Sequence, residues 1–206
     1  MRIERVEASK HKRGRVLVFL ADGACLKITE QELLVVGLRA GEDLDNAALA
    51  KLKEAAGVSN VKATAADLIG KRAMSRASLE KKLKEKGASE AEARYAAEWL
   101  EAIGAINDAD YAALLARHYG EMGYGPQRVR EKLYEKGVPR ELWEEALDQL
   151  PDNGEQIDRF LQSKLRGRTP EEKEKKRLTD ALLRRGYPWG DVKAAWNRLG
   201  SETWEN

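Results

Sequence analysis

Lysine and arginine are the residues of this sequence whose types and positions best suit a binding chemistry. One basic group lies within residues 71–86 and a second within 164–185, while the segment 108–150 holds more acidic than basic residues. Such side chains bind phosphate groups or acidic protein surfaces. The alternative is a set of solvated helix faces with acidic partners one turn away, such as Glu80 with Lys84. Composition alone favours this second interpretation.

The overall charge limits the class of partner. The chain has 37 Lys and Arg against 35 Asp and Glu, a formal net charge of +2. This balance is unsuited to a protein that coats bare nucleic acid by charge alone. A mixed surface with basic ends is better suited to an acidic protein assembly or a composite of protein and DNA.

Residue patterns for catalysis are missing from the sequence. It contains no glycine-rich phosphate loop followed by Lys-Ser/Thr, no G-x-S-x-G and no H-E-x-x-H. His11 and His118 lack the neighbours of a metal site, so we expect no metal and no cofactor. Five acids cluster near the N-terminus, but no pattern predicts a pocket that would tune their pKa values: Glu30, Glu32, Glu42, Asp43 and Asp45. We expect a protein that is not an enzyme.

The single cysteine, Cys25, excludes an internal disulfide and is typical of a reducing cytosol. It lies in a strand-like stretch, where we expect it to be buried. The first 20 residues lack a continuous apolar region, and no 18 apolar residues run together. The sequence therefore predicts a soluble, cytoplasmic protein.

The elements that would position the basic residues come from a unit that the chain repeats three times. In each copy, apolar residues stand eight and four places before a glycine. These residues are Leu79, Leu83 and Gly87, then Val129, Leu133 and Gly137, then Leu178, Leu182 and Gly186. A repeat of about 50 residues predicts one supersecondary unit copied in tandem, with each copy partly buried against its neighbour.

Residues 1–57 predict a small lobe with strands. The segments 15–20 and 25–28 flank an Asp22-Gly23 turn, and Ile3 and Val6 suggest a third strand. Thr29 and Glu32 predict a capping box for a short helix. A second helix follows over 46–56, and we expect Gly57 to end it.

From Ser59 onward every signal is helical. The predicted helices are 60–73, 76–86, 90–102, 109–122, 126–136, 139–150, 155–166, 170–185 and 188–199. Their starts rest on capping boxes and first-turn prolines: Ser89 with Glu92, Thr169 with Glu172, Pro126, Pro139 and Pro170. Residues 151–154 read as a hinge. Repeats one to three then span 58–107, 108–151 and 152–200, and residues 201–206, with Trp204, form a tail.

The predicted fold class is therefore mainly α. We expect three tandem three-helix repeats that form an elongated, curved array, preceded by the small α/β lobe. Trp99, Trp143 and Trp196 fall in the third helix of each copy, which favours a shared packing role over base stacking. Tyr124 lies in a stiff turn before Pro126, where an exposed anchor and a buried ring are equally expected.

The repeats resemble the RecX family. The resemblance rests on "ADLIGKRAMSRASLEKKLKEKG", "DADYAALLARHYGEMGYGPQRVREKLYEKGV" and "LTDALLRRGYPWGDVKAAW". The first family motif falls on Ala73, Arg76, Ser75 or Ser78, Leu79, Leu83, Lys86 and Gly87. The second falls on Asp108 or Asp110, Tyr111, Ala112, Arg117, Gly125, Leu133, Lys136 and Gly137. Segment 155–167 fits the family pattern least well.

The resemblance implies a regulator of the RecA recombinase, and hence of recombination, DNA repair and the SOS response. Family members bind the filament of RecA on single-stranded DNA along its groove and inhibit recombinase, ATPase and coprotease activities, with weak direct DNA contact. We expect a monomer without a membrane partner. The predicted partner- or DNA-binding residues are Lys71, Arg72, Arg76, Lys82, Lys86, Arg117, Arg128, Arg130, Arg184 and Arg185. The alternatives are a direct DNA-binding helical-repeat protein and a scaffold for another partner.

Overall fold

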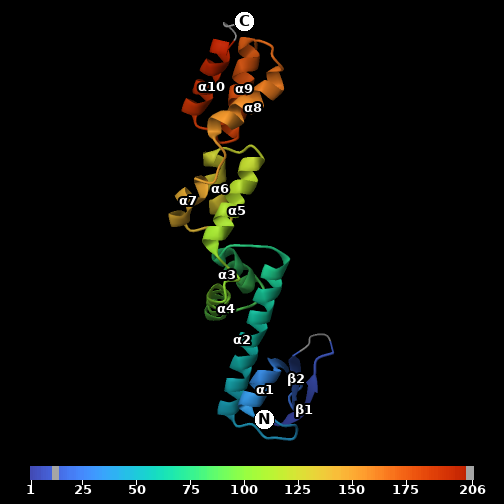
Figure 1. Cartoon of the computed structure of the whole chain (residues 1–206). Coiled ribbons are helices and arrows are strands. Elements are labelled where there is room, and N and C mark those ends of the chain that lie inside the picture. Colours follow the sequence, from blue (N-terminus) through green and yellow to red (C-terminus); the bar gives the residue numbers. More distant parts are fainter. Residues whose placement is uncertain (11–13, 203–206) are drawn as a thin grey trace. The chain divides into compact units, whose positions relative to one another are not determined.

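The computed structural model describes residues 1–10 and 14–202, with side chains described as far as Gly200. His11 and the end of the predicted tail, with Trp204, lie outside the described residues. The chain forms two compact units. The first joins Met1–Ala73 to Leu79–Ile106, and the second joins Met74–Ser78 to the chain from Asn107 onward. The fold is mainly α with a small N-terminal sheet, as the sequence predicts (Figure 1).

The first unit begins with a three-stranded antiparallel sheet in the order β1-β2-β3. Its strands are β1 (Ile3–Ala8), β2 (Arg15–Leu20) and β3 (Cys25–Thr29). Alternate residues of β2 are buried, and Val18 pairs with Val6 on one side and Leu26 on the other. The lobe core therefore lies on one face of the sheet, as expected for period-two strands.

Cys25 does not fill this core. It is exposed at the start of β3, whereas Ile28 of the same strand is fully buried. Because successive strand residues point to opposite faces, Cys25 and Ile28 cannot both face the core. The prediction that Cys25 is buried is therefore wrong.

Two helices complete the lobe, and both begin at predicted caps. In front of α1 (Glu30–Val36), Thr29 and Glu32 form the predicted capping box. Asp45 caps α2 (Asn46–Lys71) by accepting the Ala48 amide at 2.6 Å. These side chains satisfy amides that have no partner within the helix.

The helix that starts at Asp45 does not end at Gly57, as predicted. It continues through Gly57 to Lys71 and includes the predicted helix over 60–73. A helical glycine costs only about 1 kcal/mol relative to alanine. A Cβ at position 57 would lie 2.7 Å from Oε1 of Glu92, so the missing side chain lets α4 (Glu90–Ala102) approach.

The first repeat also contains α3 (Arg76–Glu85). Leu79 and Leu83 of α3 are buried, as are Ala96, Ala97 and Leu100 of α4. Ser89 and Glu92 form the predicted capping box in front of α4. The apolar stripe of the sequence thus becomes the packed face of two short helices.

The second unit holds the other two repeats. Repeat two contains α5 (Asp108–Glu121), α6 (Pro126–Glu135), the 3₁₀ turn η1 (Arg140–Leu142) and α7 (Trp143–Leu147). The predicted helix over 139–150 is therefore replaced by a 3₁₀ turn and a short helix. Val129 and Leu133 are fully buried in a cluster of their own. Pro126 stands in the first turn of α6, as predicted.

Repeat three contains α8 (Asn153–Leu165), α9 (Glu172–Arg184) and α10 (Trp189–Glu202). Asn153 and Gly154 of the predicted hinge already belong to α8, and Asp152 caps this helix by accepting the Glu155 amide at 2.9 Å. Bending at residues 151–154 stays a prediction. The predicted box of Thr169 with Glu172 is wrong, since α9 begins after Glu171 without a side-chain cap. Although segment 155–167 fits the family pattern least well, α8 is regular and buries Leu161 and Leu165.

The repeat spacing is confirmed by the backbone. Gly87, Gly137 and Gly186 follow α3, α6 and α9 with φ of +93°, +68° and +88°. This left-handed conformation closes the last helical turn and suits glycine. Among the described helices, none combines the length with the apolar character needed to cross a membrane.

Candidate partner-binding surfaces

The predicted basic residues are distributed over both units. Those of the first unit are Lys71, Arg72, Lys82 and Lys86. Those of the second unit are Arg76, Arg117, Arg128, Arg130, Arg184 and Arg185. Five of them lie on the helices that carry the repeated apolar residues: Arg76, Lys82, Arg128, Arg130 and Arg184.

Apart from Arg185, which contacts an aromatic ring, five of the ten have no carboxylate partner in the described part of the chain. Arg72, Lys86, Arg117 and Arg184 are exposed, and Lys82 is half-buried. A cation without an internal partner loses no existing ion pair when it meets an anion. These five side chains are therefore the ones best suited to contact an acidic or phosphate-bearing partner.

Other members of the predicted set already have acidic partners. Nζ of Lys71 lies 2.8 Å from Oδ2 of Asp67, and Arg130 Nη2 lies 3.2 Å from both carboxylate oxygens of Glu144. Both pairs are largely exposed, so they contribute little to stability. They do reduce the free positive charge at these two positions.

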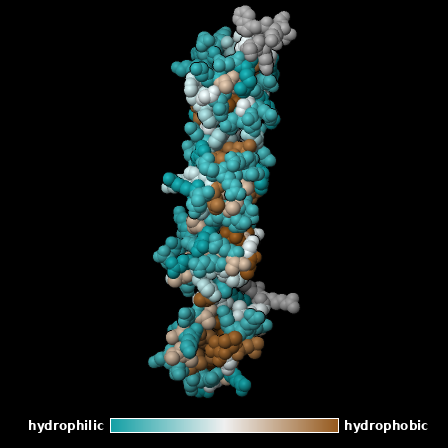
Figure 2. All heavy atoms as spheres, turned by 60° about the vertical axis from the view of Figure 1, so that its left-hand side comes forward, coloured by the Kyte–Doolittle hydropathy of each residue, from teal (hydrophilic) through white to brown (hydrophobic). Residues whose placement is uncertain are grey.

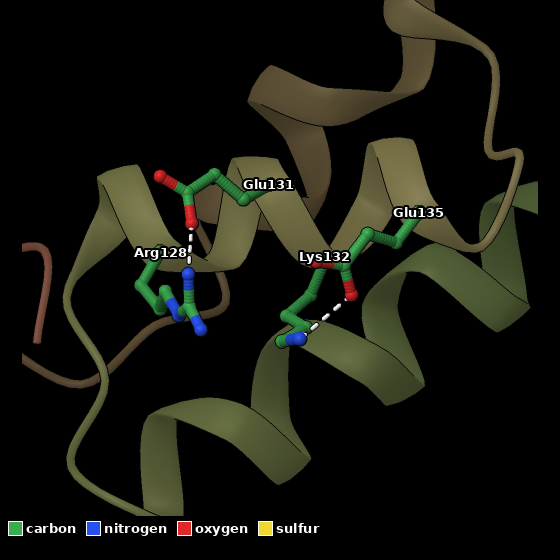
Figure 3. Close-up of polar contacts among 4 residues, drawn as sticks. All are labelled: Arg128, Glu131, Lys132 and Glu135. Atoms are coloured by element: carbon green, nitrogen blue, oxygen red, sulfur yellow. Dashed lines mark hydrogen bonds and ion pairs between the residues drawn. The ribbon is translucent and has the colours of Figure 1, made fainter.

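Helix α6 neutralises its own charges (Figure 3). Arg128 forms an ion pair with Glu131, and this hydrogen bond raises the pKa of the Arg128 guanidinium. One turn later Nζ of Lys132 lies 2.6 Å from Glu135, and that hydrogen bond lowers the pKa of the Glu135 carboxyl. Of the three repeated helices, α6 therefore offers the weakest basic surface.

Arg76 and Arg185 lie at junctions within the second unit. The Arg76 amide donates to Oδ1 of Asp108 at 2.8 Å. The guanidinium of Arg185 lies 4.6 Å from the centre of the Phe160 ring. This cation–π contact orients Arg185, and among the described residues no carboxylate pairs with its charge.

Equivalent main-chain carbonyls form two equivalent joints in the second unit. At the first joint, the carbonyl oxygen of Lys136 accepts hydrogen bonds from Ser75 Oγ at 2.5 Å and Ser78 Oγ at 2.7 Å. At the second, the carbonyl of Arg185 accepts from the Gly125 amide at 2.8 Å.

The two joints match position by position. Ser75 and Gly125 both stand four residues before the first repeated apolar residue, and Lys136 and Arg185 both precede the repeated glycine. Gly186 fits so closely that a Cβ there would lie within 3 Å of the Arg128 backbone. The sequence motif contains Ser75 and Ser78, but nothing in their spacing indicates a partner about 60 residues away.

The aromatic residues have structural partners. Nε1 of Trp143 donates to the carbonyl of Val138 at 3.0 Å, and Nε1 of Trp196 donates to Oγ1 of Thr179 at 2.9 Å. Both rings pack against the core of their repeat, as the shared position predicts. Tyr124 is half-buried, with its ring centre 5.9 Å from that of Tyr119, so it is not an exposed anchor.

The acidic residues near the N-terminus have local roles. Glu32 and Asp45 cap helices, and Oε2 of Glu42 accepts the Arg39 amide at 3.1 Å. Within residues 1–10 and 14–202, no group of three His, Cys, Asp or Glu side chains could hold a metal ion.

Figure 2 shows mainly hydrophilic side chains on the visible face of α5–α10 and a wider apolar area on the N-terminal lobe. Helix α1 carries two highly exposed apolar residues, Leu34 at 80% and Val35 at 87%.

Comparison with known proteins connects this geometry to one family. A family model described as the second three-helix domain of RecX matches residues 107–147. A Regulatory protein RecX of Pseudomonas putida is 32% identical over 130 residues, which are 62% of this chain and 83% of the relative. One of Ectopseudomonas mendocina is 33% identical over 129 residues, 62% of this chain and 86% of the relative.

Two solved structures have a similar fold. The crystal structure of a regulatory protein RecX has a TM-score of 0.73 at 23% identity and covers 95% of this chain and 98% of its own. RecX from Lactobacillus salivarius has a TM-score of 0.64 at 21% identity and covers 70% and 97%.

Proposed function

Because this chain belongs to the RecX family of regulatory proteins, we propose that it binds the RecA filament on single-stranded DNA along its groove. Binding there inhibits the recombinase, ATPase and coprotease activities of the filament without any chemistry by the regulator. The proposed partner is a cytoplasmic polymer that acts in recombination, DNA repair and the SOS response. The proposed regulator acts as a monomer.

The pair of equivalent joints in the second unit is the observation that best supports this proposal. Each joint ties the start of one repeated helix to the carbonyl before the glycine of the next. Within the second unit, the same contact therefore recurs at equivalent positions of the repeated motif. A binder with repeated sites in fixed register can contact several subunits of a polymer, so weak contacts add to a useful avidity.

The unpartnered cations would supply the contacts. Arg117 and Arg184 belong to different repeats of the second unit, and both are exposed without a carboxylate partner in the described chain. A filament offers acidic protein surface and phosphate groups, both of which such side chains bind. The neutralised helix α6 disfavours coating of bare duplex DNA.

The decisive experiment measures ATP hydrolysis by RecA on single-stranded DNA with increasing amounts of this protein. We expect hydrolysis to fall as the protein approaches the concentration of its binding sites on the filament. Hydrolysis that is unchanged at a molar excess would contradict the proposal. Addition before and after filament assembly distinguishes a block of growth from disassembly.

The alternative function is direct DNA binding by a helical repeat. Salt dependence separates it from filament regulation, because a direct binder holds naked DNA with an affinity that falls steeply as salt rises. The filament regulator should bind much more tightly when the recombinase coats the strand. Gel-shift and filament-pelleting measurements at matched ionic strength give this comparison.

A further inference from the structure

The first unit contains a hollow beside its sheet. It lies between β3 and α2 in the first unit and has a volume of about 870 Å³. Its lining includes Arg15, Lys27 and Lys53, together with Asn60 and Thr64. The hollow is much larger than a single inorganic ion requires and is comparable to a ligand site.

The charge of this hollow has one sign. No aspartate or glutamate is among its lining residues. Lys27 and Lys53 are exposed, and neither has a carboxylate partner in the described part of the chain. A concave surface with three cations and no acid concentrates positive potential and attracts anions.

Arg15 is held in place by neutral groups alone. Its guanidinium donates to Oγ of Ser59 at 2.7 Å, to the Ser59 carbonyl at 2.6 Å and to Oδ1 of Asn60 at 3.4 Å. Ser59 is buried and its hydroxyl is satisfied by this contact. The network fixes the guanidinium without cancelling its charge, which is the arrangement that favours a bound anion.

A second hollow adjoins the first and adds aromatic surface. It has a volume of about 650 Å³ and shares Arg15 and Ala63 with the first hollow. Its lining includes Lys62 and Trp99, and its one carboxylate, Glu32, already accepts the Thr29 amide.

Lys62 lies beside two aromatic rings: Trp99, which lines the second hollow with it, and Tyr95, which lies outside the lining. Its ammonium group lies 4.7 Å from the centre of the Tyr95 ring and 5.1 Å from that of Trp99. Tyr95 is 47% exposed. Trp99 is half-buried. Aromatic rings that reach the surface beside a basic groove are the surfaces on which unpaired bases stack.

We propose that the two hollows together bind single-stranded nucleic acid. The phosphodiester groups lie against Arg15, Lys27 and Lys53, and the bases lie toward Lys62, Tyr95 and Trp99. The site lies in the first unit, where the lobe meets α2 and α4. It includes none of the ten predicted filament contacts, and it requires no recombinase. A duplex would not suit it, because paired bases cannot reach the aromatic faces.

Cys25 provides a direct test because it lines the first hollow, is exposed, and is the sole cysteine of the chain. The rate of its alkylation by N-ethylmaleimide is measured on the full chain, alone and with an oligo-dT strand. We expect the strand to slow alkylation at least five-fold at low salt. Parallel samples contain inorganic triphosphate or a duplex of equal length, which should protect far less.

A pair of matched variants tests the charge contribution. Lys53 lines the hollow, whereas Lys51, also exposed and on the same helix, does not. We expect Lys53→Gln to weaken oligo-dT binding three- to ten-fold at low salt and to lower the salt slope by about 0.7. Lys51→Gln should change the affinity less than two-fold.

Two results would overturn the proposal: a strand that leaves Cys25 alkylation unchanged, or equal effects of Lys53→Gln and Lys51→Gln. Protection by triphosphate as strong as that by the strand would also overturn it, in favour of a small-anion site. The recombinase is absent from these assays. A failure of filament regulation would therefore leave their results intact, and the two hypotheses can fail separately.

Discussion

The hydroxyl of Ser78 donates a hydrogen bond over 2.7 Å to the main-chain carbonyl of Lys136, 58 residues along the chain. Ser75 donates to the same oxygen and also accepts the Ser78 amide at 3.1 Å. Two hydroxyls thus satisfy one helix-end carbonyl, and one of them also caps the start of α3.

Removal of these hydroxyls should loosen the first joint. We expect Ser75→Ala with Ser78→Ala to lower the free energy of unfolding of the second unit by about 2 kcal/mol, because a half-buried carbonyl and an amide lose partners. Urea unfolding followed by circular dichroism measures the change. Ser163→Ala, which removes only an exposed hydrogen bond to the Phe160 carbonyl within α8, should cost less than about 0.5 kcal/mol. Equal losses in both variants would contradict a joint at Lys136.

Alanine substitution at the repeated glycines should separate backbone strain from packing. Gly87 and Gly186 have nearly the same φ, +93° and +88°. A Cβ at Gly87 meets nothing within 4 Å, whereas one at Gly186 clashes with the backbone of Arg128. We expect Gly87→Ala to cost about 1 kcal/mol and Gly186→Ala at least 3 kcal/mol. Thermal unfolding measures both losses of stability. Similar losses for the two variants would contradict the close packing of Gly186 against Arg128 at the second joint.

Alkaline pH should weaken the third repeat through Tyr187. Burial raises the pKa of its hydroxyl above the ordinary value near 10. The unfolded chain therefore loses this proton first as the pH rises, so the stabilisation is complete below about pH 10 and declines above it.

We expect the melting temperature of the wild type to fall more steeply between pH 9 and pH 11 than that of Tyr187→Phe. The exposed Tyr134 provides the control, and Tyr134→Phe should follow the wild type. Identical pH profiles of the wild type and Tyr187→Phe would exclude this role of Tyr187.

The unpartnered cations should contribute more to filament binding than the ion-paired ones. We expect Lys86→Glu with Arg184→Glu to weaken binding to the recombinase filament at least ten-fold, because each reversal replaces attraction by repulsion at an exposed position. Charge reversals at Lys82 and Arg185 extend the same test. Pelleting of the filament at several salt concentrations measures the loss.

Lys132→Gln is the control for this comparison, since Lys132 is already paired with Glu135. It should change filament binding less than two-fold. If the double charge-reversal variant binds the filament as tightly as Lys132→Gln does, the basic contacts are not the source of the affinity.

The sequence predicts the repeats because their signals are local. A left-handed glycine, two apolar residues one helical turn apart and a side-chain cap each act within a few residues, and Gly137, Leu133 and Ser89 behave as expected. The boundaries of the repeats at residues 58–107, 108–151 and 152–200 stay predictions.

Features that depend on distant approach could not be predicted in this way. Gly57 lies within a helix and allows Glu92 of α4 to come close, and Arg130 pairs with Glu144, 14 residues away. The hollow around Arg15 requires a strand and a helix far apart in sequence. The face of β3 on which Cys25 lies depends on which side of the sheet α1 and α2 cover.

The unbroken course of α2 from Asn46 to Lys71 has a consequence for shortened or lengthened versions of the chain. A version that starts at residue 58 would begin in the middle of a helix. Its first four amides would have no hydrogen-bond partner, and the hollow around Arg15 would be lost. One residue inserted near Gly57 would rotate everything beyond it by about 100° relative to the sheet. The length of α2 therefore fixes the rotation of the first repeat relative to the lobe. Residues should be removed from or added to this helix only in whole helical turns.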